Sequence, residues 1–402
     1  MKKARIFVRA TLRHLSQRES LYIIVITLSL CVVLNFVARL PQLVTNEELV
    51  YSFESNSLSS IIDNALLAPL KVISLGATTL VPSVYILRAT SLLVYILVCV
   101  ALYYALRHWH TNQASILTTM AFASNAVVLG VARYGQPIVA GMGFFIFSSL
   151  LLWQLHSRSN KAVPMLVLIA AGITMYIPGA PWFLLILTIV YWDRIKPLFK
   201  NVKRQAVLIG ILLSLIALLP LLLSFARNPQ LIRSWLLLPA TLELSAVWQN
   251  ILKVPSGFIY HMPLLPAINI QRLPVFDIAS GVLFLIGLNA YRQKLRLDRT
   301  RIMIGSALVG IVLGALGSAS AAIIMLLPFA FSVIAAGIEY LLDEWYDVFP
   351  KNPFAHSFAI LLVTASVLFS MYYQLTRFFV VWPQAPETRA VYKYDDALDS
   401  RP

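Results

Sequence analysis

Long apolar runs separated by short polar segments are the dominant pattern of this chain. A hydrocarbon core of about 30 Å requires roughly 20 apolar residues per helix, and fewer where protein shields the helix. On that measure the sequence predicts about eleven membrane-spanning helices, at 21–38, 84–106, 115–132, 136–155, 163–177, 179–192, 206–225, 275–291, 302–316, 320–340 and 356–375. Short breaks alone separate the fifth from the sixth and the ninth from the tenth, so each pair is either a hairpin or one broken helix.

The composition agrees with this pattern. Of 402 residues, 59% are hydrophobic and 12% are charged, and the mean hydropathy is +0.79. These values exclude a soluble multidomain protein and predict an all-α polytopic integral membrane protein. The two cysteines, Cys31 and Cys99, lie inside apolar runs, which argues against a disulfide framework or a cysteine zinc site.

The charges mark the topology. Of the 32 Lys and Arg residues, 20 fall in alternate segments, at 1–20, 107–114, 156–162, 193–205, 292–301 and 341–356. Loops on the cytoplasmic side are enriched in basic residues, so the N-terminus is predicted inside. An odd number of spans then puts the C-terminus outside. The net charge of +15 is explained by topology and by anionic lipid headgroups, with no nucleic acid as partner.

This topology divides the chain into four parts. Residues 1–225 form a seven-span module that includes a first outer loop at 39–83, and residues 226–274 form a second outer loop. Residues 275–375 form the C-terminal membrane helices, and 376–402 form an outer tail. The basic start at 1–18 leads into a run longer than a usual signal-peptide core and without a clear cleavage site, so we expect a retained first helix.

The first outer loop has the pattern of short helices lying on a membrane surface. From Leu49 onward, apolar residues recur at intervals of three and four, and Ser55-Asn56-Ser57 divides the pattern into two helices, the second starting near Ser59 or Ser60. Thr45-x-x-Glu48 has the form of a capping box, which gives Glu48 a structural explanation. Glu47 has no such assignment and is either an ordinary first-turn acid or a catalytic carboxylate.

The order of these parts and the run Glu47-Glu48-Leu49-Val50-Tyr51 resemble the polyprenyl-phosphate-sugar-dependent glycosyltransferases of the C-type membrane fold (GT-C). The chain looks most like their protein O-mannosyltransferase and aminoarabinose transferase branch, glycosyltransferase family 39. That branch carries an Asp-Glu pair with a Tyr three residues after it, and here Glu replaces Asp. The resemblance implies catalytic roles for Glu47 and Glu48, with Glu47 as general base, and a substrate contact for Tyr51.

Two further segments carry the resemblance. Tyr85 to Leu92 resembles an Arg-x-x-Ser stretch whose Arg, here Arg88, is expected to meet the lipid phosphate. Residues 125–136 resemble the segment between spans three and four, which makes Arg133 a second phosphate ligand and Gln136 a sugar or acceptor contact. The acidic residue that many members carry near Gln136 is missing here, so no metal site is predicted. The tail from Arg377 to Arg389 looks like the outer segment of some bacterial members.

The basic residues also have structural explanations. Arg88 and Arg133 both lie at predicted outer ends of spans, where long basic side chains commonly reach to headgroups. Lys71 either joins the phosphate site or caps the interface.

The implied reaction suits these residues. Cationic donors favour departure of the lipid phosphate from the anomeric carbon. A carboxylate on the opposite face of the sugar takes the proton of the attacking hydroxyl, which gives one displacement with inversion. The donor is thus a polyprenyl-phosphate sugar, hexosyl or pentosyl, and the acceptor is a lipid, glycan or protein. No cofactor is required, and a divalent cation is left open.

The second outer loop and a late acidic run are weaker candidates. Trp235, Trp248 and Tyr260 suit either sugar stacking or an interfacial aromatic belt. His261 has no partner at ligand spacing for a metal and is a candidate acceptor contact. The run 343–347, Asp-Glu-Trp-Tyr-Asp, is either a cation site or a solvated loop.

Other classes of function remain as alternatives. A transporter or lipid flippase places ionisable residues within spans and often shows an internal repeat, and neither is evident here. A polysaccharide polymerase or ligase is expected to depend on a late loop rich in Arg and His. Motifs for an ATP-driven pump, a zinc protease and an α/β-hydrolase are missing from the sequence. The prediction is a glycosyltransferase of a bacterial plasma membrane with its active site facing outward.

Overall fold

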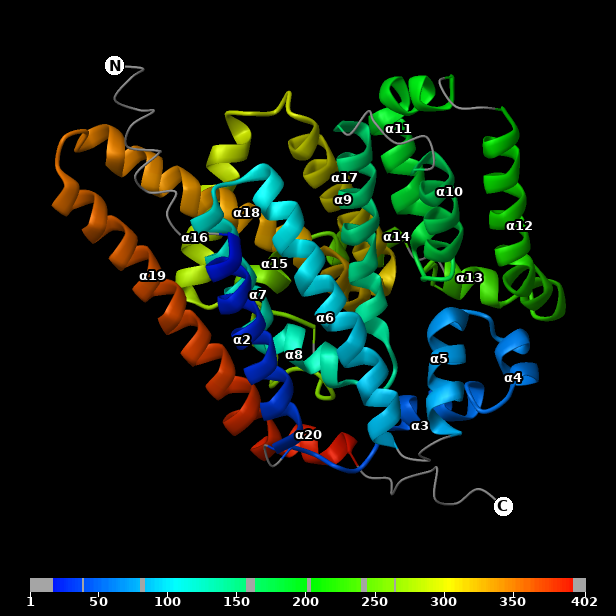
Figure 1. The fold of residues 1–402 in the computed structure, drawn as a ribbon. Coiled ribbons are helices and arrows are strands. Elements are labelled where there is room, and N and C mark those ends of the chain that lie inside the picture. The colour runs from blue at the N-terminus through cyan, green and yellow to red at the C-terminus, as the bar shows by residue number, and fades with distance from the viewer. Residues whose placement is uncertain are drawn as a thin grey trace.

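The computed structural model describes residues 17–37, 40–79, 84–156, 163–200, 204–239, 244–263 and 265–392. Within these ranges every regular element is a helix (Figure 1). The all-α prediction is therefore confirmed for this part of the chain. The basic start at 1–16, the segment 157–162 and the tail beyond 392 lie outside the described residues.

Each predicted span coincides with one or two helices. The first half of the chain contains α2 (Gln17–Val37), α3 (Asn46–Glu54), α4 (Leu58–Asp63), α5 (Ala68–Thr78), α6 (Val84–Trp109), α7 (Asn112–Ser124), α8 (Ala126–Arg133), η1 (Ile138–Met142), α9 (Gly143–His156), α10 (Val163–Thr174) and α11 (Ala180–Lys200). The second half contains α12 (Arg204–Arg227), α13 (Leu231–Trp235), α14 (Leu244–Asn250), α15 (Lys253–Ile259), α16 (Ile278–Arg292), α17 (Asp298–Leu313), η2 (Gly314–Ser318), α18 (Ala319–Val348), α19 (Pro353–Thr376), η3 (Arg377–Val381), η4 (Trp382–Gln384) and α20 (Pro386–Val391).

In the part of the chain that the structure describes, five helices are long and apolar enough to cross a membrane, or six if the bent pair α7–α8 is one span. Four shorter apolar helices accompany them, at Glu19–Asn35, Ile138–Leu151, Ala180–Asp193 and Ile278–Arg292. Helix α12 lies at one edge of the bundle and exposes a row of leucines and isoleucines, as a lipid-facing helix does (Figure 1). The chain is a multi-pass membrane protein, and the count of eleven spans stays a prediction.

The core is organised around α18. This helix runs through the middle of the bundle and packs against α16, α17, α7 and η1 (Figure 1). Side chains on all faces of α18 are buried, and the helix is accordingly apolar around its whole circumference.

The two ambiguous pairs are both hairpins. Helices α10 and α11 are separate and pack against each other, as do α17 and α18 (Figure 1). The second hairpin turns within η2, where Gly317 has a φ of +113° that a residue with a side chain rarely adopts.

The third predicted span is formed by two helices with a break between them. Helices α7 and α8 meet at Asn125 with a bend of 56°. The Asn125 side chain accepts the N–H groups of Val127 and Val128 and so caps α8. Its amide also donates to the carbonyl of Val275, at 2.9 Å, which fixes the segment between the second outer loop and α16 to the bend. The bend directs α8 so that its last residue, Arg133, lies beside the candidate site.

Residues 40–79 of the first outer loop contain the helices α3, α4 and α5 and lie with α20 at one end of the bundle (Figure 1). Ser57 caps α4, which begins at Leu58, so the division at Ser55–Ser57 is confirmed to within a residue. A third helix, α5, was not predicted. It starts after Leu67, which has a left-handed φ of 59°, and has a proline in its first turn.

Candidate functional site

The predicted capping box is present at the start of α3. The Glu48 N–H donates to Thr45 Oγ1, at 3.2 Å, and the Thr45 N–H donates to Glu48 Oε2, at 2.9 Å. Both side chains are buried. The box orients the first turn of α3 and therefore the neighbouring Glu47.

Glu48 also forms a buried ion pair with Arg88. Arg88 Nε donates to Glu48 Oε1 at 3.0 Å, and Nη2 donates to Oε2 at 3.2 Å. The Gly135 N–H donates to the same Oε1, at 2.8 Å. Only 1% of Glu48 and 3% of Arg88 is exposed, so each charge depends on the other for stabilisation away from water. The pair joins α3, the start of α6 and the turn after α8.

Two arginines hold the chain that leads into α3. Arg88 Nη1 donates to the carbonyls of Pro41 and Gln42, and Nη2 donates to that of Leu43, at 2.9 Å. Arg133 Nη2 donates to the same Pro41 carbonyl, at 2.7 Å, and Nη1 to that of Asn35. Both guanidinium groups are buried where the sequence analysis expected a phosphate. Their described partners are carbonyls and Glu48.

Glu47 has a different environment. It is exposed at the edge of a cavity of about 500 Å³. The Tyr134 hydroxyl donates to Glu47 Oε2, at 3.2 Å, and lies 3.2 Å from Thr45 Oγ1. Burial raises the pKa of Tyr134, so this phenol remains protonated at neutral pH and can donate. Glu47 is thus an accessible, oriented carboxylate facing open space.

The rest of the cavity wall is mainly apolar. Gln136 lies on it close to Glu47, together with Pro137 and Ile138 from the turn into η1. Ser320 and Ile324 of α18 line another part, and Leu265 to Ile268 come from the second outer loop. A polar end next to an apolar hollow is the usual form of a site for an amphipathic small molecule.

The tail and the second outer loop close this region. Tyr392 is buried, its hydroxyl donates to the Ala267 carbonyl at 2.8 Å, and its ring lies 5.8 Å from the Arg88 guanidinium carbon. Trp382 Nε1 donates to the Pro266 carbonyl, at 3.0 Å. Val391 lines the cavity itself. The C-terminal segment is therefore part of the site.

Of the eight predicted site residues, Glu47 and Gln136 line the cavity, and Glu48, Arg88 and Arg133 lie behind it in the hydrogen-bonded network described above, whereas the other three are elsewhere. Tyr51 and Lys71 are buried together, with the Lys71 nitrogen 5.7 Å over the Tyr51 ring. Lys71 pairs with Glu54, at 2.7 Å, and donates to the Asn64 carbonyl. His261 is exposed in separate hollows that it shares with Tyr260 and Arg272. The structure thus brings together Glu47, Glu48, Arg88, Arg133 and Gln136.

The sequence analysis missed two residues of the site, Tyr134 and Tyr392. Tyr134 lies between Arg133 and Gln136 in a segment that had already been singled out, so its position was the available signal. No local sequence signal pointed to Tyr392, because only the fold brings the tail back to Arg88. In the described part of the chain, no three His, Cys, Asp or Glu residues cluster as a metal site would require.

Comparison with solved structures gives matches over nearly the whole chain, two of which are described here. The crystal structure of apo ArnT from Cupriavidus metallidurans aligns with a TM-score of 0.58 and 12% identity, covering 92% of this chain and 77% of that one. The structure of the same protein bound to undecaprenyl phosphate aligns with a TM-score of 0.56 and 13% identity, covering 91% and 77%. The chain shares the fold of ArnT.

The resemblance to the aminoarabinose transferase branch of the GT-C fold is therefore confirmed at the level of the fold. No family model and no curated protein matches the sequence. At such low identity the likeness concerns the arrangement of helices, and the chemistry has to be argued from the residues around Glu47.

Proposed function

We propose that this protein is a membrane glycosyltransferase that moves a sugar from a polyprenyl-phosphate donor to an acceptor hydroxyl. The observation that carries the proposal is the accessible Glu47 carboxylate at the edge of a cavity of about 500 Å³ in an ArnT-like fold. ArnT itself has been crystallised with undecaprenyl phosphate. A cavity that is polar near Glu47 and apolar beyond it suits a lipid-linked sugar.

Glu47 is the general base of this proposal. Its Oε2 accepts from Tyr134, and its Oε1 has no hydrogen-bond partner among the described residues. An acceptor hydroxyl that approaches Oε1 gives up its proton as its oxygen bonds to the anomeric carbon, while the bond to the lipid phosphate breaks on the opposite face. The phosphate leaves as an anion, so one carboxylate is sufficient and the configuration inverts.

The phosphate is assigned to the cationic region around Arg88 and Arg133, with Lys71 as a more distant contributor. The two buried guanidinium groups supply positive potential next to the cavity. Direct contact with Arg88 requires the carbonyls of residues 41–43 to give up their hydrogen bonds to it. In this proposal the entry of the phosphate therefore rearranges the segment before α3.

The remaining assignments concern substrate contacts and position in the cell. Gln136, on the cavity wall, hydrogen-bonds the sugar or the acceptor. His261 contacts a larger acceptor in the separate hollows that it lines. Tyr51, a buried residue of α3, stabilises this helix. Glu48 supports the general base Glu47 by fixing the first turn of α3, in which both residues lie. The site faces outward from a bacterial plasma membrane, and the proposed reaction requires no cofactor.

The test is Glu47→Gln, expressed in cells that lack the natural copy and compared by mass spectrometry of envelope glycolipids and glycoproteins. We expect loss of the transferred sugar at an unchanged protein level, because the amide cannot take the proton. Asp63→Asn is the matched control, since Asp63 is an exposed acid of the same loop whose partner is Arg227, at 2.7 Å. Full transfer by Glu47→Gln would refute the base.

A further inference from the structure

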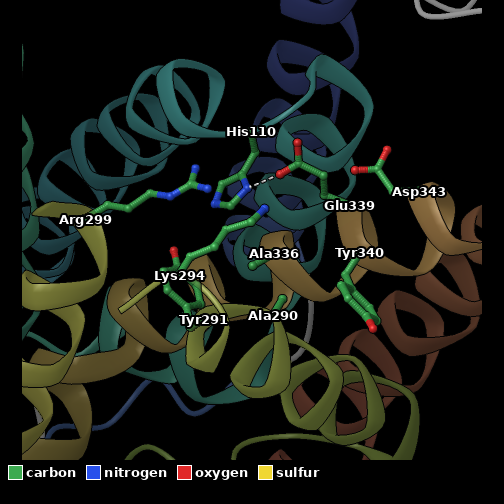
Figure 2. Close-up of a pocket in the computed structure, with 9 residues that line it drawn as sticks. All are labelled: His110, Ala290, Tyr291, Lys294, Arg299, Ala336, Glu339, Tyr340 and Asp343. Carbon is green, nitrogen blue, oxygen red and sulfur yellow. Dashed lines mark hydrogen bonds and ion pairs between the residues drawn. The ribbon is translucent and has the colours of Figure 1, made fainter. Parts of the chain in front are cut away.

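A second group of polar side chains, of which His110 and Tyr291 are buried and Lys294 is exposed, lies at the other end of α6, where the basic loops predict the cytoplasmic side. His110 follows α6, Tyr291 ends α16, Lys294 and Arg299 flank the turn into α17, and Glu339 projects from α18 (Figure 2). About 22 residues of helix separate His110 from Arg88, or roughly 33 Å at 1.5 Å per residue. This cluster is therefore distinct from the Glu47 site.

The imidazole of His110 is the centre of the cluster. Its Nδ1 lies 2.6 Å from Glu339 Oε2, and the side chain is fully buried. Because a carboxylate only accepts, Nδ1 carries the proton in this contact. The other ring nitrogen, Nε2, is buried and has no hydrogen-bond partner. Unsatisfied buried polar atoms are rare and costly, so this nitrogen points to a missing partner.

Two more atoms have the same property. The Tyr291 hydroxyl and Arg299 Nε are buried without partners, although Arg299 Nη1 donates to the Trp109 carbonyl. Both side chains line a small cavity with His110. Its volume of about 30 Å³ holds one or two waters or one ion of similar size.

The groups that meet there are mostly donors. Figure 2 shows the Arg299 guanidinium reaching the imidazole from the side away from Glu339, and the Lys294 ammonium approaching it as well. Tyr291 adds a hydroxyl. The carboxylate of Glu339 is already engaged by His110, and that of Asp343 lies beyond it at the exposed rim (Figure 2).

Protonation of His110 decides what the cavity accepts. Burial has the largest effect and lowers the pKa of His110, Glu339 raises it, and the nearby Arg299 and Lys294 lower it again, so that the pKa lies below its usual value. Neutral His110 offers a lone pair at Nε2, which suits a water that donates to it. Protonated His110 offers another N–H, so that His110, Tyr291, Lys294 and Arg299 all present donors beside the carboxylates of Glu339 and Asp343. The charged and titratable groups facing it are those of Glu339, Tyr340, Asp343, Tyr291, Lys294 and Arg299.

We propose that this pocket binds one small inorganic monoanion, with chloride as the cellular candidate, together with a proton on His110. The anion accepts hydrogen bonds from Tyr291, Arg299 and His110 Nε2, and so satisfies all three unpartnered atoms at once. It also joins the ends of α6, α16, α17 and α18, so its occupancy stabilises the packing of this end of the bundle. The inference is independent of the proposed glycosyltransferase.

The experiment follows thermal unfolding of the full-length protein in detergent with sodium bromide or chloride titrated against sodium gluconate at constant ionic strength. We expect a saturating rise in the unfolding midpoint with halide that is larger at pH 5.5 than at pH 8.5, because the anion binds with a proton. Tyr291→Phe keeps the ring and removes the hydroxyl, and should weaken the apparent halide affinity roughly tenfold or more.

Arg301→Gln is the control, because Arg301 is an exposed arginine of α17, the helix that carries Arg299, and does not line the cavity. It should retain the halide response. If the unfolding midpoints of Tyr291→Phe and wild type rise equally with halide, the proposed site is overturned. A midpoint that depends on sulfate or phosphate rather than halide, or on ionic strength alone, would also overturn it. Anomalous scattering from a bromide soak provides a second readout, and no bromide peak beside His110 at saturating halide would overturn it too.

Discussion

Adjacent carboxylates in the first turn of α3 have opposite environments. Glu48 is buried and receives four N–H groups from Thr45, Arg88 and Gly135, whereas Glu47 is exposed at the cavity and receives a single hydroxyl. A carboxylate that is saturated with donors is a poor base, and one with an open oxygen can act as a base. The difference arises from side-chain direction along the helix.

Glu48→Gln should therefore reduce stability more than it alters the chemistry of bound substrate. The change leaves the buried Arg88 charge without a carboxylate, which typically costs about 3–5 kcal/mol. We expect a lower thermal unfolding midpoint and less folded protein in size-exclusion chromatography. Glu344→Gln, at an exposed position, is the control. A Glu48→Gln protein as stable as wild type would show that the pair contributes little.

Tyr134→Phe tests the orientation of Glu47. The lost hydrogen bond to a charged oxygen is worth about 1.5–3 kcal/mol, so we expect turnover to fall by roughly tenfold to a hundredfold with the fold intact. Because the pKa of Tyr134 is raised above the usual value of about 10, the phenol keeps its proton below that pH. Loss of the Tyr134 proton should therefore not reduce turnover of the wild type at any pH below about 10. The measurement is a pH profile of turnover for both proteins, and unchanged turnover in Tyr134→Phe would remove the tyrosine from the site.

At the scale of elements, the packing of α16 against α18 depends on close backbone approach. A Cβ added at Gly287 would lie 1.9 Å from the Val333 carbonyl oxygen, and one at Gly337 would lie 2.0 Å from that of Leu283. Small residues at such contacts let two membrane helices meet. Neither helix could keep its present position if either glycine carried a side chain.

Gly287→Ala should consequently destabilise the protein by about 1–3 kcal/mol or more, through overpacking that displaces α16. Gly281→Ala in the same helix is the matched control, because nothing lies within 4 Å of the added Cβ. We expect a lowered unfolding midpoint for the first variant and an unchanged or raised one for the second. Equal midpoints would mean that the two helices separate easily.

At the scale of the whole molecule, the sequence predicted the elements better than their contacts. Apolar periodicity correctly located the helical segments, and the capping box at Thr45–Glu48 was also predicted correctly. Both signals are local in the sequence. The bend at Asn125 depends on Val275, and the partner of Arg88 is 40 residues away. Tyr392 reaches the site only through the return of the tail. Such long-range pairings have no local pattern from which to be predicted.

The central claim is that the cavity beside Glu47 holds a sugar carried on a polyprenyl phosphate. The most direct test is mass spectrometry of lipids that co-purify with gently solubilised wild type and Glu47→Gln. We predict polyprenyl phosphate with the wild type and its glycosylated form with Glu47→Gln, because the variant binds the donor and cannot transfer the sugar. Bulk phospholipid alone in both preparations would contradict the claim and favour a transporter with this fold.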